Sequence, residues 1–187
     1  MHQKKSDFEI NIDDYIVKKT TGQDFGKKLY IIENKQTKKN YLAIEYRILA
    51  NGEQITEDNC KKLCDEVEAT MYFQHPTFVE YAGFSPINFH HSPGVITIQD
   101  AAPMISQSFE KIIFGTRPSD FTNTSMQIIL VGIARSMMMI QKTDFLYILL
   151  SPDNIHLYDN YHPILCPTYY SVLPKKELQK QFIPIYA

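Results

Sequence analysis

The feature that most constrains the fold of this 187-residue chain is a change in hydrophobic period near residue 103. Before it, five short runs rich in β-branched and aromatic residues have the pattern of strands, and one segment at 56–73 has helical spacing. After it, an apolar segment at 125–141 has helical spacing. We therefore predict an α+β fold with five strands in an antiparallel sheet and one inserted helix. The five runs are residues 15–17, 29–34, 41–49, 78–84 and 95–99.

The same change in period divides the chain into three parts. Residues 1–12 are polar, and we expect them to be disordered. Residues 13–102 hold the five strands and the helix, and residues 103–187 hold short helices and short strands around turns. The short elements expected there are helices at 108–114 and 125–141 and strands at 145–150, 155–157 and 163–165.

Composition excludes several classes of protein. Hydrophobic residues make up 44% of the chain and charged residues 21%, which is too apolar for a disordered protein. The net charge of −2 argues against a nucleic-acid partner, which needs a basic patch. Lysine pairs such as Lys27-Lys28 are scattered among acidic residues, so we interpret them as solvated surface.

Cysteines and apolar runs indicate a cytoplasmic protein without a membrane anchor. The three cysteines suggest reduced thiols, and Cys60 and Cys64 lack the further ligands that a metal site needs. The residues after Met1 are polar, unlike a signal peptide. The longest apolar stretch, 128–139, contains Gly132 and Arg135 and is too short to span a bilayer.

The order of these segments over residues 13–187 resembles that of a eukaryotic protein kinase domain. The matching motifs are Glu66 followed by His75-Pro76, then Gly132-Ile133-Ala134-Arg135, Ser151-Pro152-Asp153-Asn154-Ile155 and Phe182-Ile183-Pro184-Ile185-Tyr186. The resemblance implies a bilobal kinase-like fold. Residues 13–102 would form the N-lobe with its αC helix, and 103–187 an incomplete helical C-lobe that stops before the A-P-E segment.

The resemblance also implies that the catalytic residues are lost. Glu45 stands at the lysine of V-A-I-K, and Leu149 stands where the catalytic aspartate belongs. Pro167 replaces the aspartate of D-F-G, so Asn154 is the one metal-ligand position retained. Leucine and proline can neither orient a substrate hydroxyl nor bind magnesium. We therefore expect a pseudokinase with no catalytic residues and no metal site.

Two carboxylates would then stand where an ion pair is usual. Glu66 on the helix would approach Glu45, and like charges that close repel unless a cation intervenes. We expect both carboxylates to turn to solvent. The alternative is that Arg47, two residues along the same strand face, neutralises Glu45.

The kinase resemblance further implies a degenerate nucleotide pocket, with Leu29 and Ala43 as its apolar roof and Gln99 as gatekeeper. We expect no cofactor, and weak, magnesium-independent ATP binding if ATP binds at all. The residues of this predicted pocket are Gly22, Gly26, Leu29, Ala43, Glu45, Glu66, Gln99, Ala102, Asn154 and His156.

These expectations lead to one function and two alternatives. The first is a non-catalytic binding or scaffold module that engages a protein partner. The alternatives are an active or weakly active ATP-dependent kinase with displaced catalytic residues, and a truncated fragment without function. In a truncated C-lobe the apolar helix at 125–141 would lack its packing partner and favour association.

Overall fold

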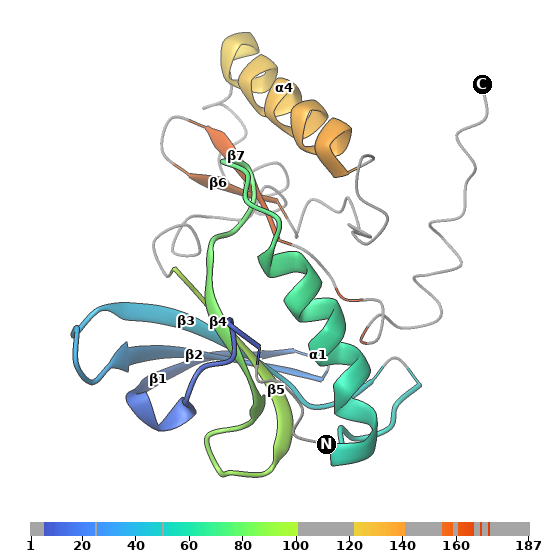
Figure 1. The fold of residues 1–187 in the computed structure, drawn as a ribbon. Helices are drawn as coiled ribbons and strands as arrows, with labels where there is room; N and C mark the ends of the chain where they lie inside the picture. Colours follow the sequence, from blue (N-terminus) through green and yellow to red (C-terminus); the bar gives the residue numbers. More distant parts are fainter. Residues whose placement is uncertain are drawn as a thin grey trace.

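The computed structural model describes residues 6–24, 26–49, 51–100, 122–140, 155–158, 161–166, 169 and 172. Within them, one antiparallel sheet of five strands is crossed by helix α1, and helix α4 lies against a two-stranded hairpin (Figure 1). This confirms the predicted α+β class and the five-stranded sheet. The five strands are β1 (Tyr15–Asp24), β2 (Lys27–Asn34), β3 (Asn40–Tyr46), β4 (Tyr81–Ile87) and β5 (Pro93–Asp100).

The strands lie in the order β1-β2-β3-β5-β4, and every neighbouring pair is antiparallel. The first three strands form the meander that the sequence predicts. Strand β1 continues to Asp24, well beyond the apolar run at 15–17. Its residues 16–21 are exposed because β1 is an edge strand, so hydrophobicity alone does not mark its length.

Helix α1 (Glu57–Met71) begins and ends where local signals place it. The backbone N–H of Thr56 donates to the Asn59 side chain at 2.7 Å, which ties down the first turn. Glu57 in that turn complements the positive end of the helix dipole. Leu63 and Val67, one turn apart, are fully buried and anchor the helix to the sheet.

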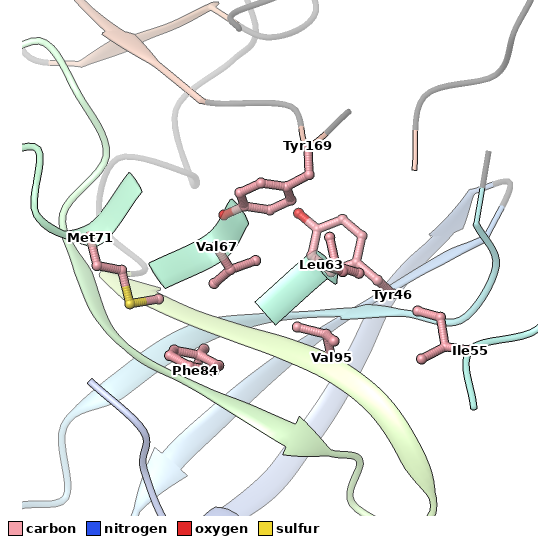
Figure 2. Close-up of a cluster of buried hydrophobic side chains, with 8 residues drawn as sticks. All are labelled: Tyr46, Ile55, Leu63, Val67, Met71, Phe84, Val95 and Tyr169. Carbon is pink, nitrogen blue, oxygen red and sulfur yellow. The ribbon is translucent and has the colours of Figure 1, made fainter. Parts of the chain in front are cut away.

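The sheet has an apolar cluster on each face. The first cluster lies between α1 and the sheet (Figure 2) and consists of Tyr46, Ile55, Leu63, Val67, Met71, Phe84, Val95 and Tyr169. The second cluster consists of Ile12, Tyr30, Ile32, Ala43, Ile96 and Ile98. Because successive strand residues point to opposite faces, neighbouring residues of β3 contribute to different clusters.

The N-terminal segment differs from its predicted disorder over residues 6–12. The N–H of Ile10 donates to the carbonyl of Phe84 at 2.9 Å, and the N–H of Phe84 donates to the carbonyl of Phe8 at 3.0 Å. Ile12 is 2% exposed in the second cluster. The segment therefore covers edge strand β4, whose unpaired backbone groups would otherwise need water.

Helix α4 (Asn123–Ile140) packs on the hairpin of β6 (Ile155–Tyr158) and β7 (His162–Leu165). At Gly132 a Cβ atom would lie 2.5 Å from Cγ of Pro163, so glycine permits the close contact. The prediction that this helix lacks a packing partner is therefore wrong for one of its faces. The opposite face stays exposed. The expected elements at 108–114 and 145–150 lie outside the described residues.

Candidate functional site

The predicted roof of the nucleotide pocket is not formed by the two residues expected to share it. Leu29 pairs with Ile44, whereas Ala43 pairs with Tyr30. Ile44 packs on the first cluster beneath α1, and Ala43 is buried in the second cluster on the other face. Leu29 and Ala43 therefore lie on opposite faces of the sheet, because the register of β2 and β3 places Ile44 beside Leu29.

Glu45 also lies on the face away from α1, where it is 1% exposed. Its carboxylate accepts a hydrogen bond from the hydroxyl of Tyr30 at 2.5 Å. Arg47 donates to the same carboxylate from Nε at 2.9 Å and from Nη2 at 3.2 Å. The expectation that Glu45 turns to solvent is wrong, and the alternative that Arg47 neutralises it is confirmed.

The three side chains form a closed group in which both carboxylate oxygens have partners. Burial and the hydrogen bond to Glu45 raise the pKa of Tyr30 to about 12, so its hydroxyl remains a donor. The hydrogen bond to Glu45 raises the pKa of Arg47. A buried carboxylate is tolerated only with such partners. Glu45 is therefore a structural anion and offers no free oxygen for catalysis.

Tyr46 occupies the last position of β3 on the α1 side. Figure 2 shows its ring beside that of Tyr169, with centroids 5.4 Å apart and planes at 75°. The hydroxyl of Tyr169 donates to that of Tyr81 at 3.0 Å. Burial raises the pKa of Tyr169 to about 12 and that of Tyr46 well above its usual value. The space between α1 and this end of the sheet is thus filled by neutral aromatic side chains.

Glu66 and Gln99 lie, like Leu29, on the α1 side. Glu66 is half-buried on α1, so the sheet separates it from Glu45 and the two carboxylates do not face each other. Gln99 is 1% exposed on β5, and its Nε2 makes no hydrogen bond to a described residue. Leaving a buried donor without a partner lowers stability by about 1–3 kcal/mol. A ligand that accepts a hydrogen bond from Gln99 would therefore gain binding free energy.

The other predicted pocket residues are dispersed. Gly22 pairs with Leu29 in the β1–β2 hairpin, and Gly26 follows the turn of that hairpin with a φ of 70°. His156 is on β6, in the hairpin beneath α4, where it pairs with Ile164. The structure does not bring these three into one contact group with Gln99. Ala102, Leu149, Asn154 and Pro167 lie outside the described residues, and their assignments stay predictions.

Sequence reasoning missed a cavity of about 440 Å³ at one end of the sheet. It lies where β2 begins, β3 ends and the β4–β5 turn approaches. Its lining residues are Gly26, Lys27, Lys28, Arg47, Ile48, Gln54, Ile55, Asn88, Ser92 and Pro93. We interpreted the pair Lys27-Lys28 as solvated surface. The register of β2 with β3 pairs Lys28 with Glu45, which places Lys28 on the same face as Arg47.

The described residues contain neither a cluster of metal ligands nor a helix that could span a membrane. In the ranges given above, no three His, Cys, Asp or Glu side chains are grouped as a metal site. Cys60 and Cys64 are half-buried on α1, and burial raises the pKa of Cys64 to about 12. Neither α1 nor α4, the two α-helices within those ranges, is both long and apolar enough to cross a membrane.

Comparison with known proteins gives no identification. No protein-family model matches this chain, and no curated protein is similar enough to count as a relative.

Proposed function

We propose that this chain is a kinase-like domain that has lost phosphoryl transfer and acts as a binding module for a protein partner. The observation that carries the proposal is the pair of adjacent β3 residues Glu45 and Tyr46. A kinase needs a lysine from this strand to hold the α- and β-phosphates. Here the residue facing α1 is a tyrosine, and the neighbouring carboxylate is buried on the other face.

The fold is compatible with the kinase-like part of the proposal. A five-stranded antiparallel sheet crossed by one helix between β3 and β4 is the arrangement that the resemblance implies for the N-lobe. The sequence adds Leu149 and Pro167 at the two aspartate positions. Loss of a catalytic base and of a metal ligand each removes orders of magnitude in rate, which supports a non-catalytic role.

The protein partner is supported by the exposed face of α4. Val131 is 50% exposed and Met138 is 64% exposed, and the two residues are seven positions apart, which is about two helical turns. Leu130, beside them, is 58% exposed. Exposed apolar side chains gathered on one helix face are typical of an interaction surface. We refer to Leu130, Val131 and Met138 as the α4 row.

Thermal unfolding of the full chain with ATP, with and without magnesium, tests the loss of catalysis. We expect no magnesium-dependent rise in melting temperature and no transfer of phosphate to a generic protein substrate. A magnesium-dependent rise of several degrees, or measurable transfer, would contradict the proposal and favour an active enzyme with displaced residues. The control is the same titration with magnesium chloride alone.

A second candidate, metal-independent nucleotide binding, is favoured by the buried amide of Gln99, whose Nε2 has no partner in the described part of the chain. If a nucleotide binds on the α1 side, ATP should stabilise the protein equally with and without magnesium. The variant Gln99→Met, which keeps the volume and removes the donor, should then weaken binding. Equal ATP affinity in the wild type and in Gln99→Met would contradict this placement.

The α4 row can be tested in the purified chain by light scattering. We expect concentration-dependent self-association, because exposed apolar rows associate in water. Met138→Glu should reduce it, whereas Gln127→Glu, which adds the same single negative charge at an exposed polar position of α4, is the matched control. A monodisperse monomer at all concentrations would argue against the row as an associating surface.

A further inference from the structure

The cavity at the end of the sheet combines side chains from three parts of the chain that are distant in sequence. Lys28 comes from the start of β2, Arg47 from the residue after β3, and Asn88 from the turn between β4 and β5. Ile48 and Gln54 pair as an isolated bridge and close one wall. Lys28 and Arg47 lie on the sheet face of Glu45, away from the nucleotide pocket predicted on the α1 side.

The lining of the cavity is positively charged. Of its ten described residues, three are basic and none is acidic, although the whole chain has a net charge of −2. The carboxylate in contact with this lining is Glu45, which Arg47 and Tyr30 already hold. On the face of Glu45, the two cations Lys28 and Arg47 outnumber this one described carboxylate.

The two cations on the Glu45 face still have donors available. A guanidinium has five N–H groups, and Arg47 uses one on Nε and one on Nη2 for Glu45, which leaves its Nη1 for a ligand. The ammonium of Lys28 lies 5.1 Å from the ring centroid of Tyr30 and makes no ion pair with a described residue. Tyr30 thus places the ammonium, and Glu45 orients the guanidinium.

Asn88 adds a neutral donor that is fixed in place. Its Oδ1 accepts from the N–H of His90 at 2.9 Å and from the N–H of Ser92 at 3.1 Å. The N–H of Asn88 also donates to the carbonyl of Ser92 at 2.9 Å, which closes the turn. With Oδ1 held by two donors, the Nδ2 group is left to donate, and it has no partner among the described residues.

We propose that this cavity binds the phosphate group of a small phosphorylated molecule. Lysine, arginine and amide N–H groups that converge from three elements match a tetrahedral dianion, which has several oxygens to accept them. The oxygens of a phosphate can accept from all three groups, whereas a carboxylate would leave donors unused. A volume of about 440 Å³ exceeds one phosphate and admits a small organic group attached to it.

The test is a titration of the ¹⁵N-labelled full chain with inorganic pyrophosphate at constant ionic strength, followed by amide chemical shifts. We expect saturable shifts at Gly26, Asn88 and Ser92. Asn88→Asp keeps the acceptor that closes the turn and replaces the Nδ2 donor with a carboxylate oxygen, so binding should weaken about tenfold or more. Lys28→Gln should weaken it about fivefold.

The matched control is Lys35→Gln, which removes the same charge from the exposed β2–β3 turn and should change the dissociation constant less than about twofold. Glycerol phosphate and adenosine monophosphate are titrated in parallel. Similar affinities for both assign recognition to the phosphate, whereas a large preference for the nucleotide would overturn recognition by phosphate alone. Shifts that do not saturate, or that are equal in wild type, Asn88→Asp and Lys28→Gln, would overturn the proposal.

Discussion

Arg47 donates two hydrogen bonds to the buried carboxylate of Glu45, one to each oxygen, at 2.9 and 3.2 Å. The two residues are two apart on one strand face, and Tyr30 completes the group from β2. The strand therefore carries a buried anion that two side chains hold, which makes substitution of Glu45 by lysine informative.

The first prediction concerns Glu45→Lys, which rewrites Ala43-Ile44-Glu45 to the kinase pattern. The new ammonium would be buried beside Arg47 with no carboxylate, so we expect a loss of about 3–5 kcal/mol in unfolding free energy and no gain of kinase activity. Urea unfolding followed by circular dichroism measures the loss. Glu53→Lys, the same change at an exposed position, should cost under about 1 kcal/mol. A variant as stable as the wild type would refute the buried group.

The second prediction is a double-mutant cycle between Tyr30 and Glu45. Tyr30→Phe removes a hydrogen bond to a charged group and should lower the unfolding free energy by about 1.5–3 kcal/mol. In the background of Glu45→Gln the same change should cost less, because the acceptor is neutral. Tyr41→Phe, on the same face, is the control and should be near neutral. Equal effects of Tyr30→Phe in both backgrounds would count against the coupling.

The third prediction concerns the tyrosine that fills the space beneath α1. Tyr169→Ala should lower the unfolding free energy by about 3–5 kcal/mol, because it removes a ring that is 2% exposed and packed on Tyr46. Tyr169→Phe keeps the ring and removes only the bond to Tyr81, so about 1 kcal/mol is expected. Thermal and urea unfolding measure both. A similar loss in both variants would mean that the ring is not packed as described.

The fourth prediction tests the N-terminal segment that covers β4. Gly83 has a φ of 149°, and a Cβ there would lie 2.4 Å from Cγ2 of Ile10 and 2.7 Å from the carbonyl oxygen of Phe8. Gly83→Ala should therefore destabilise the protein by about 2 kcal/mol or more. Gly22→Ala, where no other atom lies within 4 Å, is the matched control and should be tolerated. Equal melting temperatures for the two variants would contradict the close packing.

The fifth prediction is a loss of stability at alkaline pH. Tyr30 and Tyr169 have a pKa of about 12 in the folded protein, against an ordinary value of 10.0. Between these values the unfolded chain binds fewer protons than the folded one, so stability falls as pH rises from 10 to 12. The buried Tyr169 contributes on the order of 2–3 kcal/mol across that window, and Tyr30, which solvent screens more, contributes less. Urea midpoints measured at pH 8 and pH 11 check it. An unchanged midpoint would be inconsistent with neutral buried hydroxyls.

Elements with a strong local pattern agree with prediction, and elements held by distant partners do not. Residues 56–73 carry a cap and a helical apolar face, and α1 forms there. Residues 8–10 show little hydrophobic periodicity. Their position is set by backbone hydrogen bonds to edge strand β4 and by close packing against Gly83. The polar part of β1 likewise has no hydrophobic pattern from which it could be predicted. It is held in the sheet by backbone pairing with β2.

In the candidate site too, local relationships between residues were predicted and relationships that depend on distant contacts were not. The sequence identified Arg47 as the possible partner of Glu45, since residues two apart on a strand share a face. The sequence could not predict on which face of the sheet Glu45 and Arg47 lie, because this depends on which face α1 covers. Leu29 and Ala43 were assigned to one roof by their motif positions, and a register that pairs Leu29 with Ile44 separates them.

By itself, the sequence determined the α+β class, the order of the five strands and the inserted helix, and Arg47 as a possible partner of Glu45, because these follow from local periodicity and residue chemistry. The tertiary structure alone decided that Glu45 is buried away from α1 and that Tyr46 and Tyr169 fill the space beside it. It also decided that Lys28, Arg47 and Asn88 line one cavity. Those relationships depend on strand register and on which face each element covers, and both are set by contacts between residues far apart in the chain.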